Sequence, residues 1–182
     1  MSLPTNTRFV HPDIVSSHFH FRRGDRVADF GAGTGYFLQA LSKAVGNDGK
    51  VYGCEIRKNL VEKMSQQVKE WRLPNTETIW GDLEEEKGTK LKDGLLDGGV
   101  MVNVLFQLED KATALKEIAR VLRKGGKLFV IDWTESFAGL GPHPMNVCTE
   151  PMAKALLEEH GFTYERSFPA GEHHYGLAFR KN

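Results

Sequence analysis

The sequence predicts an α/β fold, in which a mostly parallel sheet is covered on both faces by helices and ends in an antiparallel hairpin. Short β-branched or apolar runs alternate with longer amphipathic stretches along the 182 residues. Strands that alternate with helices form parallel sheets with right-handed crossovers. The last two apolar runs have no helix between them, which indicates that these two strands pair antiparallel.

Each element follows from its local pattern. The strands are expected at 26–31, 50–56, 76–80, 96–102, 127–132, 162–168 and 174–180, where apolar runs are bounded by turn residues. The helices are expected at 34–45, 58–71, 110–122 and 149–160, with apolar residues at helical spacing. Gly125 and Gly126 are expected to end the third helix, and Thr149 to cap the fourth.

Composition predicts a single domain, made of an N-terminal helical segment over 1–24 and a core over 25–182. Lys plus Arg and Asp plus Glu both number 24, so the formal net charge is zero. Nucleic acids and anionic membranes bind clustered basic residues, so neither is an expected partner.

The start of the chain lacks the apolar stretch of a signal peptide or membrane span, and two cysteines cannot form a disulfide framework. We therefore expect a cytoplasmic protein.

A glycine-rich turn joins the first strand to the first long helix. Gly31, Gly33 and Gly35 lie in VADFGAGTGYF, where missing Cβ atoms let the backbone bend tightly and approach a ligand. Glu55 follows about twenty residues later, at the end of the next strand, where a carboxylate can accept hydrogen bonds from ribose hydroxyls. This pattern favours a nucleotide-like ligand over a plain structural turn.

The spacing of the glycines limits which class of nucleotide-like ligand fits. A pyrophosphate loop has the pattern G-x-G-x-x-G, whereas this chain has G-x-G-x-G with Asp29 just before it. A carboxylate beside the loop repels a diphosphate and suits a ligand that carries an ammonium group, as S-adenosylmethionine does. Asp82 follows the third strand and can accept from an adenine amino group, with Ile56 and Leu83 on either side of the ring. Carboxyl ends of parallel strands are where open α/β sheets bind ligands.

With these motifs, the chain resembles the class I S-adenosylmethionine-dependent methyltransferases, of the small-molecule group related to ubiquinone biosynthesis, over nearly its whole length. The resemblance implies a Rossmann-like, doubly wound seven-stranded sheet, mostly parallel with a C-terminal antiparallel hairpin. It also implies S-adenosylmethionine as cofactor and S-adenosylhomocysteine as product. The expected cofactor-binding residues are Asp29, Gly31, Ala32, Gly33, Gly35, Tyr36, Phe37, Glu55, Ile56, Asp82, Leu83, Asn103, Val104 and Leu105.

The chain departs from its relatives in ways that leave the acceptor open. Many relatives have two His residues after the fourth strand, where this chain has Phe106 and Gln107. It also lacks a substantial inserted cap, and 134–147 is its only sizeable extra loop. We expect a small-molecule acceptor of unidentified structure, while the oligomeric state stays open.

Methyl transfer from a sulfonium is an in-line displacement in which the cofactor supplies the chemistry and the protein chiefly aligns the reactants. No catalytic residue is assigned. A general base would help a hydroxyl or amine acceptor, and the candidates are His18, His20, His143 and Asp132. All four are expected to be structural or exposed. Phe19 and Phe21 are expected to pack beneath the N-terminal segment rather than to close over the site.

Metal-dependent chemistry is not expected. His173 and His174 are neighbours on a predicted strand, where adjacent side chains point to opposite faces, and no His or Cys has zinc-site spacing elsewhere. Cys54 and Cys148 are expected to be inert thiols, too few for arsenite methylation. Two other functions remain open: a cofactor-binding but inactive regulatory or scaffold subunit, and a nicotinamide oxidoreductase, which the loop spacing disfavours.

Overall fold

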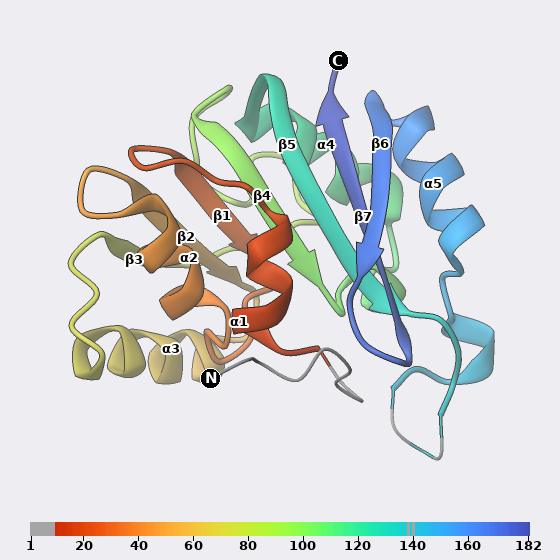
Figure 1. The fold of residues 1–182 in the computed structure, drawn as a ribbon, viewed down its shortest axis with the longest axis horizontal. Coiled ribbons are helices and arrows are strands. Elements are labelled where there is room, and N and C mark those ends of the chain that lie inside the picture. The colour runs from red at the N-terminus through yellow and green to blue at the C-terminus, as the bar shows by residue number, and fades with distance from the viewer. Residues whose placement is uncertain (1–9, 138, 140) are drawn as a thin grey trace.

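A computed structural model describes residues 10–137, 139 and 141–182. Seven strands form one sheet in the order β3-β2-β1-β4-β5-β7-β6 (Figure 1). The strands are β1 (Arg26–Phe30), β2 (Lys50–Glu55), β3 (Thr76–Trp80), β4 (Leu96–Val102), β5 (Leu122–Trp133), β6 (Phe162–Pro169) and β7 (His174–Lys181). β1 to β5 pair in parallel, and β7 pairs antiparallel with both β5 and β6. The predicted fold class is confirmed.

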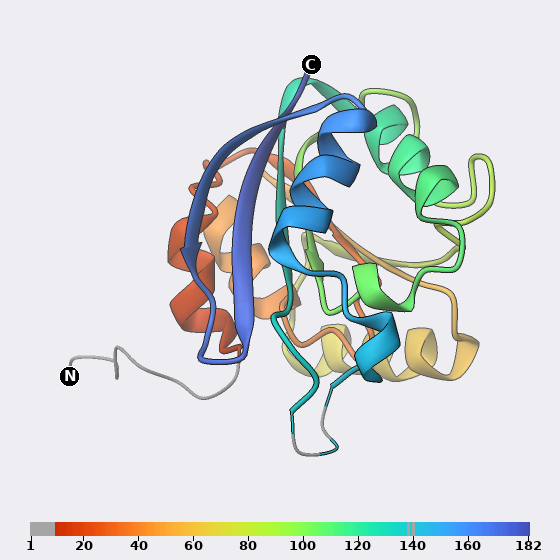
Figure 2. The same cartoon turned by 90° about the vertical axis from the view of Figure 1, so that its right-hand side faces the viewer.

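Helices cover both faces of this sheet (Figure 2). The helical elements are α1 (Pro12–Val15), η1 (Ser16–His18), α2 (Leu38–Val45), α3 (Lys58–Glu70), η2 (Leu105–Gln107), α4 (Lys111–Val121), η3 (Pro144–Asn146) and α5 (Glu150–Glu159). α1 and α2 contribute to one apolar cluster together with Met64 of α3, whereas α4 and α5 contribute to the other. The sheet is therefore buried on both sides, as a doubly wound fold requires.

The described part of the N-terminal segment, which begins at Val10, packs against the sheet, whereas residues 1–9 lie outside the described residues. The Phe19 ring is buried and lies 4.9 Å, centroid to centroid, from Phe129 of β5. Phe21 meets the same Phe129 ring edge-on at 5.4 Å, and a Cβ on Gly98 would lie 2.5 Å from the Phe21 ring. The Phe21 ring can therefore pack against β4 only because residue 98 is a glycine. The expectation that Phe19 and Phe21 pack rather than close over the site agrees with these contacts.

The start of the first long helix, the junction between α4 and β5 and the cap of α5 differ from the sequence expectation. The first long helix begins at Leu38 instead of residue 34, because the glycine turn continues through Phe37. α4 ends at Val121, and Leu122 is already extended and pairs with Leu96, so Gly125 does not end the helix. Gly125 instead adopts a φ of +73° in a turn within β5. Thr149 occupies the N-cap position of α5 without a capping hydrogen bond from its side chain.

Candidate functional site

The glycine turn after β1 is fixed by its backbone. The amide groups of Gly31 and Ala32 both donate to the carbonyl of Cys54, at 2.9 Å each. Gly31 has a φ of +75°, and a Cβ there would lie 2.5 Å from Cγ2 of Val104. Only glycine allows this close approach between the turn and the segment that follows β4. The turn therefore brings three strand ends to one place.

Glu55 holds the turn from the end of β2. Its side chain is only 4 % exposed, and Oε2 accepts from the amide of Gly33 at 3.0 Å. Oε1 accepts from both the amide and the Nε of Arg57, also at 3.0 Å. The carboxylate is thus oriented by the loop on one side and by a partly exposed guanidinium on the other.

Asp29 lies deeper, on β1 beside the turn, and is 3 % exposed. Burial raises the pKa of its carboxyl to about 7, and the nearby Glu55 carboxylate contributes in the same direction. A buried acid of this kind favours a cationic partner, because a positive charge beside it would restore its ionised form.

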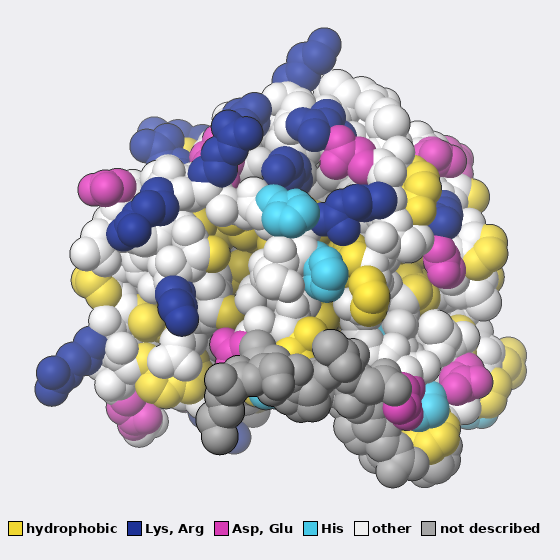
Figure 3. Space-filling model, viewed as in Figure 1, with side chains coloured by type: hydrophobic (Ala, Val, Ile, Leu, Met, Phe, Trp, Pro, Cys, Tyr) yellow, Lys and Arg dark blue, Asp and Glu magenta, His cyan; other side chains and the backbone are white. Residues whose placement is uncertain are grey.

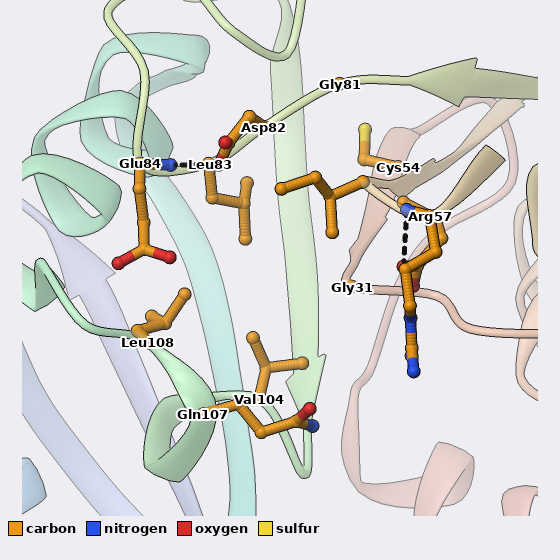
Figure 4. A pocket seen from close by; sticks show the side chains of 12 residues that line it. Gly31, Cys54, Arg57, Gly81, Asp82, Leu83, Glu84, Val104, Gln107 and Leu108 are labelled. Atoms are coloured by element: carbon orange, nitrogen blue, oxygen red, sulfur yellow. Dashed lines mark hydrogen bonds and ion pairs between the residues drawn. The ribbon is translucent and has the colours of Figure 1, made fainter.

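A first cavity of about 220 Å³ opens at the ends of β2 and β3 (Figure 4). Its walls come from the glycine turn, the residues after β2 and β3, and η2. It is lined by Gly31, Cys54, Glu55, Ile56, Arg57, Gly81, Asp82, Leu83, Glu84, Val104, Gln107 and Leu108. Asp82 accepts from the amide of Glu84 through Oδ1 at 2.8 Å, so it also closes a local turn. Only one of its oxygens is used in this way.

A second cavity of about 350 Å³ adjoins the first, and the two share Gly31, Arg57 and Gln107. It extends from the glycine turn toward the carboxyl ends of β4 and β5 and the start of β7. It is lined by Val10, Asp29, Gly31, Ala32, Gly33, Thr34, Tyr36, Phe37, Arg57, Val102, Asn103, Gln107, Trp133 and His174. Together the two cavities form one elongated site along the carboxyl ends of the parallel strands.

Asp132 fixes the segment between β4 and α4. Its side chain is 1 % exposed; Oδ2 accepts from the amide of Phe106 at 3.2 Å and Oδ1 from that of Trp133 at 2.8 Å. Burial raises the pKa of its carboxyl to about 6, although these backbone hydrogen bonds pull the pKa down. Asp132 lines neither cavity. It therefore supports the site wall, and its geometry gives it no access to a reacting atom.

Most of the residues predicted to bind the cofactor lie on these walls. Gly31, Glu55, Ile56, Asp82, Leu83 and Val104 line the first cavity. Asp29, Ala32, Gly33, Tyr36, Phe37 and Asn103 line the second. Two predicted residues lie on neither wall: Leu105 is fully buried in the core, and a Cβ on Gly35 would meet Leu38 at 2.9 Å. Leu105 and Gly35 contact neighbouring side chains, and a part for them in cofactor binding stays a prediction.

Sequence reasoning missed several lining residues. Arg57 and Gln107 lie where the cavities meet, and Trp133 and His174 lie at the far end of the second cavity. Trp133 and His174 are paired across β5 and β7. The antiparallel direction expected for the last strand was the available signal, since it brings the start of β7 to the carboxyl end of β5.

The other candidate bases lie outside the site. His18 stacks on Phe168 at 5.2 Å, and His20 lies with Arg22 and Asp97 near the amino ends of the parallel strands. His143 is exposed and caps η3, where its Nδ1 accepts from the amide of Met145. None of the three lines either cavity.

His173 and His174 have different surroundings. Nδ1 of His173 lies 2.9 Å from Glu135, and its ring stacks on Phe137, whereas His174 lies against Trp133. Within the described ranges, no three His, Cys, Asp or Glu residues are grouped as metal ligands. Cys54 and Cys148 are both buried free thiols, and burial raises the pKa of each.

Comparison with known proteins identifies the family. The structure superimposes on a SAM dependent methyltransferase from Aquifex aeolicus with a TM-score of 0.88 and 27% identity, over 99% of this chain and 94% of that one. A family model described as a methyltransferase domain matches residues 28–130, more than half of the chain. The chain belongs to the class I S-adenosylmethionine-dependent methyltransferases. Members of this methyltransferase family use S-adenosylmethionine as the methyl donor.

Curated relatives of this methyltransferase are longer than the matched region. A demethylmenaquinone methyltransferase from Geobacillus sp. (strain WCH70) is 32% identical over 143 residues, which are 70% of this chain and 60% of the relative. A ubiquinone/menaquinone biosynthesis C-methyltransferase from Chromobacterium violaceum is 31% identical over 121 residues, 66% of this chain and 48% of the relative. The match thus spans about half to three fifths of these relatives. Among the described residues, no helix is long and apolar enough to cross a membrane.

Proposed function

We propose that this chain transfers a methyl group from S-adenosylmethionine to a small-molecule acceptor. One observation carries the proposal: Asp29, Glu55 and Asp82 lie at the carboxyl ends of successive strands, Asp29 and Glu55 within β1 and β2 and Asp82 just after β3, and they line two cavities that meet at a glycine turn. Their spacing along the site suits a ligand with an ammonium group, a ribose and an adenine at successive positions.

The first cavity fits the adenosine part. Asp82 keeps one carboxylate oxygen for an amino group, and Ile56 and Leu83 provide apolar surface next to it. A carboxylate offers roughly four lone-pair sites, and three N–H groups already occupy Glu55. Accepting two ribose hydroxyls therefore requires Arg57 to give up one of its two hydrogen bonds. The Arg57 side chain is 59% exposed and has room to do so.

The part of the second cavity next to the glycine turn fits the amino acid end. Asp29 is the buried anion there, and pairing with an ammonium group would lower the pKa of its carboxyl again. When bound, the cofactor supplies an electrophilic methyl group on a sulfonium. The residues around it then bind, orient and exclude water, which is the protein's share in such a displacement.

The remainder of the second cavity fits the acceptor. Its walls toward β5 and β7 are mostly aromatic or uncharged, and a pocket of this size takes a small molecule rather than a macromolecular segment. The names of the curated relatives, which act on demethylmenaquinone or in ubiquinone and menaquinone biosynthesis, support a small acceptor for this chain as well.

Calorimetry with S-adenosylhomocysteine tests the cofactor part of the proposal. We expect binding to the wild type and a loss of roughly tenfold to a hundredfold in affinity for Glu55→Ala, since charge-assisted hydrogen bonds are worth about 1.5–3 kcal/mol. Glu165→Ala, which removes an acid paired with Arg180 far from both cavities, is the matched control and should bind as the wild type does. Absence of binding to the wild type would overturn the proposal.

Transfer itself is tested with methyl-labelled cofactor and the small-molecule fraction of a bacterial extract. We expect label in at least one product of low molecular weight. Binding without any transfer would instead identify a cofactor-binding, inactive subunit, and label in protein or nucleic acid added as alternative acceptors would refute the small-molecule assignment.

A further inference from the structure

His174 is a buried polar side chain whose ring nitrogens are unused. It begins β7, is 6 % exposed, and lines the second cavity. Neither Nδ1 nor Nε2 has a hydrogen-bond partner within the described part of the chain. Its ring lies 4.2 Å, centroid to centroid, from that of Trp133. Buried polar groups without partners cost about 1–3 kcal/mol each, so an arrangement of this kind needs an explanation.

Asn103 lines the same cavity and carries a second unused polar atom. It follows β4 with a φ of +57°, in the left-handed region that few residues other than Gly, Asn and Asp adopt. Its Oδ1 is buried and also lacks a partner in the residues that the structure describes. Two unpartnered polar side chains from different strands therefore line one cavity. Strain and unpaired polar groups concentrate at ligand sites.

We propose that His174 and Asn103 bind the methyl acceptor by hydrogen bonds to an uncharged hydroxyl or amine group. The inference rests on the proposed function, because it assigns the far end of the second cavity to the acceptor. His174 and Asn103 then decide which acceptors are used, since a site built around buried polar groups rejects an analogue that leaves them unpaired.

The charge of the surroundings selects a neutral group. Burial lowers the pKa of His174 to about 4, so the imidazole is neutral near pH 7, with one ring nitrogen as donor and the other as acceptor. Asn103 adds an amide oxygen that accepts. A hydroxyl, which donates and accepts, satisfies His174 and Asn103 better than a carboxylate or a phosphate would.

The first test uses phenol as a donor-bearing probe and fluorobenzene as its matched control without a hydroxyl. Protein labelled with ¹⁵N in its histidine rings is saturated with S-adenosylhomocysteine and titrated with each compound. We expect phenol to move the ring-nitrogen resonances of His174, and fluorobenzene to leave them in place. Resonances that do not respond to phenol, or that respond equally to both compounds, would overturn the inference.

The second test uses variants. His174→Phe keeps a ring beside Trp133 and removes both nitrogens, while His174→Gln keeps a donor and an acceptor. With labelled cofactor and a dilution series of the extract, we expect His174→Phe to lower transfer at limiting extract by roughly tenfold or more, and His174→Gln to restore part of it. The effect should appear in the extract concentration needed for half-maximal rate.

Two controls separate this inference from the proposed function. Affinity for S-adenosylhomocysteine should be the same in both His174 variants and the wild type. His160→Phe, at the C-cap of α5 and on the wall of neither cavity, should transfer as the wild type does. If the cofactor product does not bind the wild type, the proposed function fails. If it binds and His174→Phe transfers normally, only the acceptor assignment fails.

Discussion

Polar side chains differ in pairing and burial between the amino ends and the carboxyl ends of the parallel strands. At the amino ends, charged groups are paired and in contact with water: Arg123 lies 2.7 Å from Asp97, which also accepts from the amide of Arg26 at 2.8 Å. Lys and Arg side chains gather at these amino ends, which lie at the top of the view in Figure 3. At the carboxyl ends, Asp29 is buried with a raised pKa, and the ring nitrogens of His174 have no hydrogen-bond partner among the described residues.

Two positive-φ glycines at the amino ends differ from Gly31 at the carboxyl ends. Gly24 and Gly125 turn the chain at the amino ends with open space around them, since a Cβ would meet nothing within 3.8 Å. Gly31 turns it at the carboxyl ends, where a Cβ would lie 2.5 Å from Val104. One end of the sheet is arranged for stability in water. The other holds buried Asp29 and the unpaired polar atoms of His174 and Asn103, which is an arrangement expected of a binding site.

The largest expected difference between the two ends comes from glycine replacement. Gly31→Ala combines a left-handed backbone with a clash against Val104, so we expect a loss of about 3 kcal/mol in the free energy of unfolding and no detectable S-adenosylhomocysteine binding. Gly125→Ala has a similar φ without the clash and should lose only about 1 kcal/mol. Urea denaturation and calorimetry measure both. Equal losses would remove the distinction between the ends.

Asp132→Asn tests how the site wall is held. Each carboxylate oxygen accepts a backbone N–H, and an amide group would place its own N–H₂ against one of these donors. We expect a loss of about 2 kcal/mol in stability and faster amide exchange at Phe106, while the amino ends stay protected. Hydrogen exchange followed by NMR gives the readout. Uniform deprotection throughout the sheet would contradict the local role.

Asp29 should make cofactor binding depend on pH. In the protein without ligand its pKa is raised to about 7, so the carboxyl is protonated below that pH, while an ammonium ligand favours the ionised form. Affinity for S-adenosylhomocysteine should fall by up to about tenfold per unit as the pH drops below 7, and Asp29→Asn should bind more weakly with little pH dependence. Calorimetry across pH 5 to about 8 tests this, and a flat wild-type profile would argue against it.

The raised pKa also affects stability without ligand. Because the folded protein holds this proton more tightly than the unfolded chain, the contribution of Asp29 to stability is greatest at low pH and is lost as the pH rises toward 7. In Asp29→Asn this loss should be absent, so the variant should gain stability relative to the wild type above pH 7. Thermal denaturation at several pH values measures the difference.

The smallest effect is expected at the amino ends. Arg123→Ala removes an ion pair that is more than half exposed on the arginine side, so we expect a change of at most about 0.5–1 kcal/mol that shrinks in high salt. Affinity for S-adenosylhomocysteine should not change. A strong effect on binding would mean that the two ends are coupled through the sheet.

Sequence patterns predicted the sheet and most of the first cavity because those features are local. Each of Asp29, Glu55 and Asp82 lies within two residues of the end of a predicted strand, and the carboxyl ends of parallel strands meet at one edge by topology alone. Fold and cofactor class followed from this order. The boundary errors occurred where packing overrides propensity, as at Leu122, which extends into β5 once it pairs with Leu96.

The second cavity depends on features that no local pattern reveals. His174 reaches the site only because it pairs with Trp133 in an antiparallel register. A shift of that register by one residue would turn the imidazole to the opposite face. Arg57 lies between the cavities because its side chain turns back to Glu55, a contact that a sequence cannot specify. Tertiary pairing decided these positions.

Because β7 runs in the reverse direction, the site is lined by residues from two separate parts of the sequence. Residues up to Leu108 line the first cavity, where the proposed function places the adenosine part, whereas Trp133 and His174 line the far end of the second cavity. Recombination near the end of β5 could therefore exchange substrate preference between homologues without disturbing nucleoside recognition. A fold with this arrangement can diversify its products while its shared chemistry is inherited intact.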